Sequence, residues 1–320
     1  MDKLLGILSL VWYTDRMRNI LQNKGVTWID IQDPQKEDIE YLRKDFRFHP
    51  LVLEQLIPPS WSTKVETFSD HLLLILSFPS YNKEKRESRP RELDIIVTKN
   101  ILITSHYDPM PSLKEILDKC NLYAEEKEQW MTRGAGYLLY HVLQTLWEDC
   151  SAKVNRIDQK LTAIEESIFQ GKEREMLKEI SIVKTNIIAF WKIVRPQKGP
   201  LTSLRDTSGE FFGPEFTPYF SNLRNHWARV ASSVLTQKDT VEAFEDTNAA
   251  LLSHKTNEIV KILTIFSVIV LPLAILSQIF GMNTSSLPLQ DDPRGFWIIT
   301  TVMILGMFVF FLYFKKKRWL

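Results

Sequence analysis

The sequence predicts a cytoplasmic α/β domain followed by a long stalk helix and two transmembrane helices. Two stretches near the carboxyl end, residues 262–280 and 296–314, carry no charged side chain, and about 19 residues suffice for a helix to cross a bilayer. Strand-like runs separated by turns fill the first part of the chain, whereas helical periodicity fills the middle. No helix breaker interrupts residues 219–271, so one long helix should run into the first apolar stretch.

The composition restricts the classes of function. The 320 residues are 44% hydrophobic and 25% charged, which suits one or two globular domains with a membrane part. The net charge of +1 argues against a nucleic-acid partner, because nucleic-acid-binding domains usually show a basic excess. Cys120 and Cys150 fall in segments predicted to be helical and cytosolic, so both should be reduced thiols. Zinc-site spacings and the motifs of common enzymes are missing from the sequence, so we expect neither a cofactor nor catalysis.

Residues 1–125 form the predicted cytoplasmic α/β domain. No cleavage site follows the apolar run at 4–13, so we interpret it as a buried strand and expect a cytosolic amino terminus. Charged residues at 82–90 should form an exposed loop. The other expected elements are a strand at 28–31, a helix capped by Asp33, a short helix at 51–56, and hairpins that pair 63–68 with 71–78 and 92–98 with 101–106.

Residues 126–218 should contain an antiparallel helical hairpin and an irregular connection. Apolar stripes run on both sides of Gly171, which should end the first helix of the hairpin. The connection is expected at 196–218, which is rich in Pro and Gly. Acidic side chains on the outer face of the hairpin either keep the domain soluble or concentrate divalent cations. They are Glu148, Asp149, Glu165, Glu166, Glu173, Glu175 and Glu179.

Residues 219–261 form the predicted stalk. Its apolar positions alternate at spacings of four and three, as in the seam of a coiled coil. Because Gln237 and Asn248 are polar, the seam should surround an axis that holds water or other helices. A helix over 219–280 would be on the order of 90 Å long, so only part of it can lie in a membrane. The seam consists of Leu223, Trp227, Val230, Val234, Gln237, Val241, Phe244, Asn248 and Leu251.

The first predicted transmembrane helix, 262–283, carries a stripe of small or polar residues that begins in the stalk. The stripe is Asn257, Val260, Thr264, Ser267, Leu271, Ala274, Gln278 and Gly281. Polar groups are costly against lipid, so the stripe should face protein or water, and packing of small residues between helices would also place it there. Two spans in one chain cannot enclose a pathway, so a pore would need several copies of the chain.

The carboxyl end resembles a known family. A long helix enters a first span, Gly281-Met282-Asn283 stand at its outer end, and a short loop, a second span and a basic tail follow. This order resembles the CorA-type divalent metal ion transporters. The segments WIDI, FHPL and LITSH extend the resemblance over most of the chain. The resemblance implies a funnel-shaped homopentamer in the lipid bilayer whose first span lines a pore for Mg²⁺ and for Co²⁺ or Ni²⁺.

Within that resemblance, Gly281, Met282 and Asn283 are the selectivity motif. Mg²⁺ holds its water tightly, so oxygens of the Asn283 amide and the Gly281 carbonyl can hydrogen-bond the hydrated ion without trapping it. Met282 should hold the loop by packing, because a thioether is a poor ligand for a hard cation.

Charged residues flank the two spans. The external loop, 284–295, contains Asp291 and Asp292, which either form a solvated turn or attract cations at the outer mouth. The basic tail, 315–320, follows the second predicted span, 296–314, and places both termini in the cytoplasm of a plasma- or inner-membrane protein. The resemblance places the tail cations around the inner mouth of the pore, and anchoring to anionic lipid is a compatible role. They are Lys315, Lys316, Lys317 and Arg318.

The chain departs from the family pattern at the head of the stalk. Family members often carry acidic residues there, through which internal Mg²⁺ holds the pore shut. This chain has Asn222 and Asn225 instead. Because amides are poorer Mg²⁺ ligands than carboxylates, we expect weak or altered closure by internal Mg²⁺.

Three functions compete at this point. The leading one is a passive channel or transporter for divalent cations, above all Mg²⁺, driven by the membrane potential. The first alternative is a zinc transporter of the same superfamily, against which Met282 argues because those relatives usually vary the middle residue of the motif. The second is a membrane-anchored scaffold or sensor, which would pass no ion.

Overall fold

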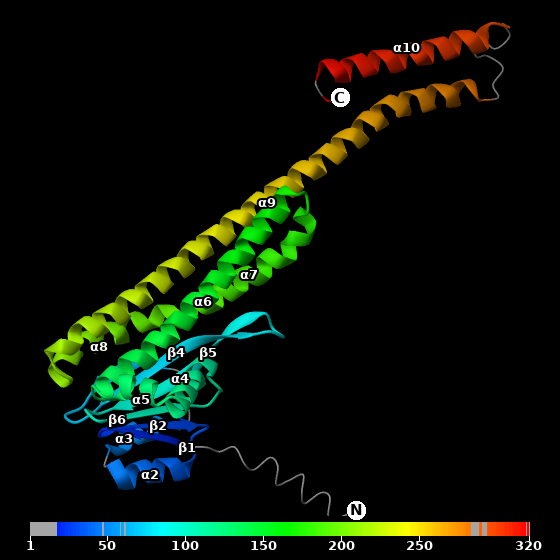
Figure 1. Ribbon diagram of the computed structural model, residues 1–320. Coiled ribbons are helices and arrows are strands. Elements are labelled where there is room, and N and C mark those ends of the chain that lie inside the picture. Colours follow the sequence, from blue (N-terminus) through cyan, green and yellow to red (C-terminus); the bar gives the residue numbers. More distant parts are fainter. Residues whose placement is uncertain are drawn as a thin grey trace, which may run out of the picture. The chain divides into compact units, whose positions relative to one another are not determined.

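The computed structural model describes residues 18–46, 48–57, 59–60, 62–282, 288–289, 293–317 and 319. The chain divides into two compact units, the first ending at Glu245 and the second beginning at Asp246. Figure 1 shows the order of the elements along the chain. The strand predicted at 4–13 lies outside the described residues.

The first unit is built on a six-stranded mixed sheet with the strand order β1-β2-β6-β5-β4-β3. The parallel pair is β2 with β6, and the other neighbouring strands are antiparallel. The strands are β1 (Arg18–Asn23), β2 (Val26–Gln32), β3 (Lys64–Thr67), β4 (Leu72–Asn82), β5 (Glu87–Val97) and β6 (Ile101–His106). Both predicted hairpins, β3–β4 and β5–β6, are confirmed.

Helices cover both faces of the sheet (Figure 1). On one face lie α2 (Lys36–Phe46) and α3 (Pro50–Glu54), and their apolar residues pack with Ile29, Leu73 and Ile96 of the strands. Other helices of the unit, α4 (Pro111–Leu122), α5 (Ala124–Met131), α6 (Ala135–Phe169) and α7 (Glu173–Val194), lie on the opposite face. Residues 72–76 have no exposed surface, as expected for an apolar run that is covered on both sides.

The prediction of a loop over residues 82–90 was wrong. The β4 and β5 strands stay paired out to Asn82 and Glu87, leaving a turn at 83–86. At this turn the Arg86 guanidinium donates two hydrogen bonds to the Glu179 carboxylate of α7, at 3.0 and 2.5 Å. Charged side chains can occupy the exposed positions of a strand, so their presence did not exclude pairing.

The cap predicted at Asp33 was also wrong. Asp33 adopts a left-handed backbone conformation with φ of 55°, and its N–H donates to the His106 carbonyl of β6 at 2.8 Å. The helix begins three residues later, where the Asp38 carboxylate accepts a hydrogen bond from the backbone N–H of Gln35 at 3.0 Å. Asp38 therefore satisfies a donor at the start of α2 from inside its first turn.

The helical hairpin is confirmed as α6 and α7. Gly171 stands between them with φ of 87°, and the N–H groups of Gly171 and Lys172 donate to carbonyls of the last turn of α6. This is the left-handed helix ending that glycine favours. Cys120 of α4 and Cys150 of α6 are free and buried, and burial raises the pKa of Cys150 to about 12.

The irregular connection predicted at 196–218 is mostly helical. After a 3₁₀ turn, η1 (Arg195–Gln197), the chain forms α8 (Lys198–Phe211), and the turn η2 (Pro214–Phe216) leads into α9 (Thr217–Phe280). Proline was misleading here because Pro196 and Pro200 stand in first turns, where a missing N–H costs little.

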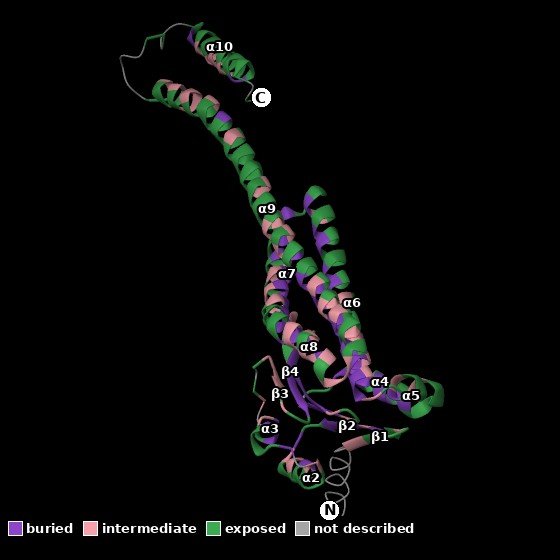
Figure 2. Cartoon of the chain, turned by 90° about the vertical axis from the view of Figure 1, so that its left-hand side faces the viewer, coloured by how far each residue is buried: buried purple, intermediate pink, exposed green. Residues whose placement is uncertain are grey.

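The stalk seam does not surround an axis between Leu223 and Val241. Within the first unit this part of α9 carries many buried residues (Figure 2), and it is bonded to α6 and α7 of the same chain. Trp227 Nε1 donates to the Val194 carbonyl at 2.9 Å, and Gln237 Nε2 donates to the Val154 carbonyl at 2.9 Å. Gln237, one of the two polar residues that suggested water or other helices, is therefore hydrogen-bonded to a backbone carbonyl inside the packed unit.

Asp94 of β5 is a buried carboxyl group that forms no ion pair with another described residue. It is 1% exposed, and its Oδ1 has no hydrogen-bond partner in the described part of the chain. Burial, followed by the charge of nearby Glu92, raises the pKa of Asp94 to about 8. In the folded chain the group is therefore mostly protonated at neutral pH.

We expect Asp94→Asn to stabilise the fold, by an amount that grows with pH. The pKa of Asp94 is higher in the folded chain than in the unfolded chain. The protonated carboxyl therefore contributes fully to the stability of the fold below about pH 4, and this contribution is lost as the pH rises toward about 8. Asn cannot ionise and escapes this loss. At pH 7 the gain should be on the order of 1–3 kcal/mol.

Denaturant unfolding of the full chain at pH 5, 7 and 8.5 measures this effect. The exposed Glu125→Gln serves as control and should change stability by less than about 0.5 kcal/mol at each pH. A loss of stability in Asp94→Asn at every pH would show that the fold uses the ionised carboxylate.

Candidate ion pathway

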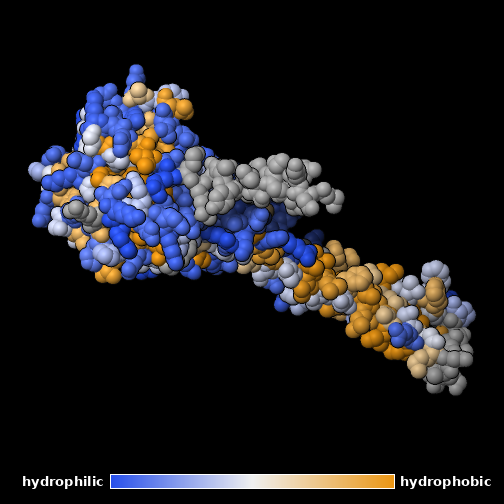
Figure 3. All heavy atoms as spheres, turned by 90° about the horizontal axis from the view of Figure 1, so that it is seen from below, coloured by the Kyte–Doolittle hydropathy of each residue, from blue (hydrophilic) through white to orange (hydrophobic). Residues whose placement is uncertain are grey.

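The second unit consists of the remainder of α9, from Asp246, and of α10 (Gly295–Lys316). Both helices contain a stretch long and apolar enough to cross a membrane, and few residues of either stretch are buried. Figure 3 shows hydrophobic side chains gathered over this unit, and Figure 2 shows their exposure. An uninterrupted apolar surface of this length needs lipid or other protein around it.

The predicted polar stripe lies along one side of α9. Its members repeat every seven residues in two series, 257-264-271-278 and 260-267-274-281, which is the pattern of helices that supercoil around a shared axis. All of the eight are exposed except Ala274, which is half-buried. Unlike the seam nearer the start of α9, this stripe is not covered by its own chain.

The hydroxyl groups of the stripe are satisfied within the helix. Thr264 Oγ1 donates to the Val260 carbonyl at 2.7 Å, and Ser267 Oγ donates to the Leu263 carbonyl at 2.8 Å. Such bonds let a hydroxyl sit in an apolar environment at little cost. These two residues therefore do not need water to satisfy their hydroxyl groups.

Gln278 is different. Its side-chain amide is exposed, lies two residues before the end of α9, and makes no hydrogen bond with another described residue. An amide with two donors and an acceptor is costly in hydrocarbon unless protein or water satisfies it. Gln278 is thus the residue of the first span that most clearly calls for a wet or protein-lined environment.

The Gly-Met-Asn motif begins where α9 ends. The Gly281 N–H donates to the Ser277 carbonyl at 3.0 Å, and a Cβ at this position would lie 3.2 Å from the same oxygen. Met282 is 57% exposed, so the packing role expected for it is not seen within one chain. Asn283 lies outside the described residues.

The predicted charged groups fall on both sides of α10. Asp291, Asp292 and Arg318 lie outside the described residues. Lys315 and Lys316 form the last turn of α10 and Lys317 follows as its cap; the three side chains are exposed. Cations at a helix C-terminus are favoured by the helix dipole.

The acidic residues of the helical hairpin do not form one free surface. Asp149 pairs with Lys153 at 2.6 Å, Glu179 pairs with Arg86, and Glu173 is buried. These pairings weaken the interpretation of the hairpin as a cation reservoir. At the head of α9, Asn222 and Asn225 are both exposed.

Sequence reasoning missed the contacts that fasten α9 to the hairpin. Besides the bond from Trp227, Lys184 of α7 pairs with Glu245 of α9, and Ser151 of α6 lies 3.1 Å from His226 Nε2. The tryptophan of the seam, whose indole N–H needs an acceptor when it is buried, was a signal of a specific partner. These contacts join the helix that reaches the spans to the soluble domain.

A large soluble α/β domain, a continuous helix leading to an exposed polar stripe, and a second apolar helix define a membrane protein with a large soluble domain. The family model described as CorA-like Mg2+ transporter protein matches residues 23–316. The chain belongs to this family of divalent cation transporters, and its family is one of transporters, not of enzymes. It is a membrane protein with its large domain on the cytoplasmic side.

Individual relatives agree with this assignment. The chain is 29% identical over 298 residues to the cobalt/magnesium transport protein CorA of Thermotoga maritima, covering 92% of this chain and 83% of the relative. It is 15% identical to the zinc transport protein ZntB of Yersinia pseudotuberculosis, covering 92% and 88% of the two chains. The complete structure of the CorA magnesium transporter from Methanocaldococcus jannaschii shares the fold, with a TM-score of 0.79 at 23% identity over 94% of this chain and 93% of that one.

Proposed function

We propose that five copies of this chain form a channel that passes Mg²⁺ into the cell. The observation that carries the proposal is the exposed stripe of α9, with its seven-residue repeat and the unsatisfied amide of Gln278. Several copies of such a helix around an axis would place the stripe on a common inner surface. Gly281, Met282 and Asn283 at its outer end form the selective entrance.

The chemistry of the stripe favours Mg²⁺ over Zn²⁺. Its polar side chains, Asn257, Thr264, Ser267 and Gln278, offer oxygen atoms and amide donors. Oxygen groups suit hydrated Mg²⁺, which keeps several of its waters, whereas zinc sites prefer the nitrogen and sulfur of His and Cys. The similarity to a zinc transport protein makes Zn²⁺ the competing cargo.

The membrane potential supplies the driving force. At about 2.3 kcal/mol per charge per 100 mV, an inside-negative membrane gives a divalent ion about 4.6 kcal/mol for entry. The ring of Lys315, Lys316, Lys317 and Arg318 then lies at the inner mouth, and Asp291 and Asp292 at the outer one.

Ion preference is tested by uptake into proteoliposomes under an inside-negative potential, with Mg²⁺, Co²⁺, Ni²⁺ and Zn²⁺ offered separately. We expect Mg²⁺ to enter fastest, with Co²⁺ and Ni²⁺ carried as well. Zn²⁺ uptake faster than Mg²⁺ uptake would reassign the cargo.

A further inference from the structure

A cavity of about 250 Å³ opens in the soluble unit between the β4–β5 hairpin and the α6–α7 hairpin. Its lining residues are far in sequence from the spans. Tyr81 of β4, Arg156 and Lys160 of α6, and Asn186 and Phe190 of α7 are among the residues that line it.

The cations of α6 converge on this cavity. The helix has 35 residues and contains three Lys or Arg residues, and all three line the cavity. Lys153, Arg156 and Lys160 follow one another at spacings of three and four, which places them on one face of the helix. On a helix that also carries five acidic residues, this grouping concentrates positive charge at one point.

Two of these three cations are available to a ligand. Lys153 Nζ already donates to the Asp149 carboxylate and to the Pro79 carbonyl, each at 2.6 Å. Arg156 forms no ion pair or hydrogen bond with any other described residue. Lys160 Nζ lies 4.9 Å from the centre of the Tyr81 ring and has no ion pair within the described chain.

The nearest acidic groups do not cancel this charge. Asp149 is neutralised by Lys153, and both oxygens of Glu179 accept from Arg86. The Arg86 pair holds the pKa of Glu179 below its usual range. Lys160 also contributes, after Arg86 and Lys178, to the electrostatic stabilisation of Glu179, so its charge is partly shared with that carboxylate. Arg156 has no acidic partner among the described residues, and the two cations together leave an excess of positive charge at the rim of the cavity.

The buried part of the cavity lining includes an amide and an aromatic ring. Asn186 is 5% exposed and accepts a hydrogen bond from Ser88 Oγ through its Oδ1 at 2.9 Å. Asn186 is one of the residues that line the cavity, and no described residue accepts a hydrogen bond from its Nδ2. Phe190, fully buried, closes the base. Cationic groups at the rim, an amide donor below and apolar walls make a site for an anion with a small organic body.

We propose that this cavity binds a small phosphate-bearing molecule. The planar guanidinium of Arg156 can donate two parallel hydrogen bonds to phosphate oxygens, and Lys160 adds a second charge for a dianion. At about 30 Å³ per water, the cavity has room for about eight waters, which matches a phosphate with an attached sugar-sized group.

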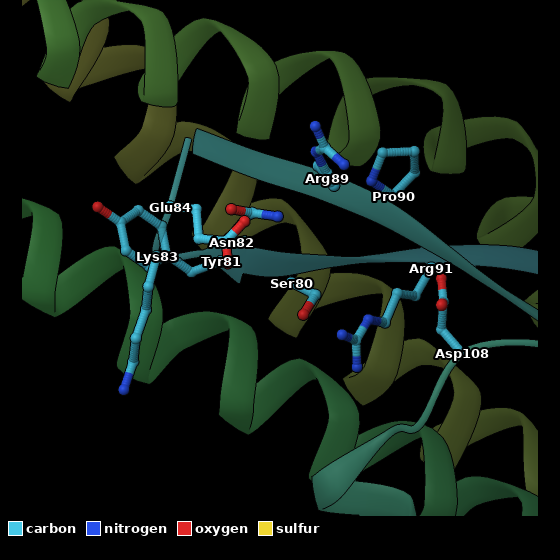
Figure 4. Close-up of a pocket in the computed structure, with 9 residues that line it drawn as sticks. All are labelled: Ser80, Tyr81, Asn82, Lys83, Glu84, Arg89, Pro90, Arg91 and Asp108. Atoms are coloured by element: carbon cyan, nitrogen blue, oxygen red, sulfur yellow. The ribbon is translucent and has the colours of Figure 1, made fainter. Parts of the chain in front are cut away.

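A neighbouring cavity of about 770 Å³ shares Tyr81 but is lined by both cationic and anionic side chains (Figure 4). Its lining mixes Lys83, Arg89 and Arg91 with Glu84 and Asp108, so an anion bound there would also meet two carboxylates. Figure 4 shows Lys83 and Glu84 at the hairpin turn and Asp108 at the opposite end of this lining. We therefore assign the phosphate to the α6 cavity alone.

Isothermal titration of the full chain in maltoside detergent, with chelator present, tests the site with AMP, inorganic phosphate and citrate as probes. We expect AMP or phosphate to bind at submillimolar concentration. The double variant Arg156→Gln/Lys160→Gln should raise the Kd at least tenfold, because two charge-assisted contacts are lost. The matched control Arg174→Gln, an exposed cation of α7 outside the cavity, should change it less than twofold.

The probes also identify the source of the phosphate. Tighter binding of AMP than of phosphate would show that the organic body contributes, and equal binding would identify a site for the free ion. Three results would overturn the proposal: no heat from either probe up to about 10 mM, tighter binding of citrate than of both, or an equal loss in Arg174→Gln. The titration does not depend on ion flux. Failure of the phosphate proposal would therefore leave the transport proposal unaffected, and failure of transport would not change the titration.

Discussion

Asn283→Ala should reduce Mg²⁺ uptake by reconstituted protein to the level of empty vesicles. Each copy of the chain would contribute one amide oxygen to the ring that holds the hydrated ion. A hydrogen bond to a charged group is worth about 1.5–3 kcal/mol, and the loss occurs in every copy at once. A decrease of at least about a hundredfold in uptake rate is therefore expected.

Fluorescence of a Mg²⁺-sensitive dye inside the vesicles measures this rate. The matched control is Asn155→Ala, which removes an exposed amide from α6 and should leave uptake within about twofold of the native rate. Native uptake by Asn283→Ala, in oligomers of unchanged mass, would move the selective step away from the motif and make the Gln278 ring the next candidate.

Trp227→Ala should strongly destabilise the packing of α9 on the α6–α7 hairpin. The indole is 6% exposed and donates to the Val194 carbonyl, the last residue of α7. Removing a buried tryptophan leaves a cavity and costs about 3–5 kcal/mol. Trp227→Phe keeps most of the apolar volume but leaves the carbonyl without this donor, at a cost of about 1–2 kcal/mol.

Denaturant unfolding of the full chain separates these two costs. Leu235→Ala provides the control, because this residue of the same helix is 43% exposed and should cost less than about 1 kcal/mol. Equal stability losses in Trp227→Ala and Leu235→Ala would show that the Trp227 contact does not hold α9 to the hairpin.

Local patterns in the sequence were enough to predict the parts of the fold that depend on them. The apolar runs of the spans, the hairpin strands and the Gly171 turn each have a signal that neighbouring residues supply. The extension of β4 and β5 through residues 82–90 was missed because pairing with a partner strand overrode a charged, loop-like composition. The helix α8 was missed because prolines at its start mimic an irregular linker.

The two seven-residue patterns of α9 mark the limit of sequence reasoning about the site. The seam that contains Gln237 and the stripe that contains Gln278 have the same spacing and the same mixture of apolar and polar residues. Burial separates them: Gln237 is bonded to Val154 inside its own chain, whereas Gln278 is exposed. Spacing shows that a helix face is covered, but the covering partner depends on packing across the whole chain.

Transport itself is tested by reconstituting the purified native chain into vesicles that hold a Mg²⁺-sensitive dye, under an inside-negative potential of about 100 mV. Mg²⁺ should accumulate inside, and collapsing the potential should slow its entry. If neither Mg²⁺ nor any other divalent cation tried enters vesicles whose protein is shown to be assembled, the result would contradict a pore and favour a membrane-anchored scaffold.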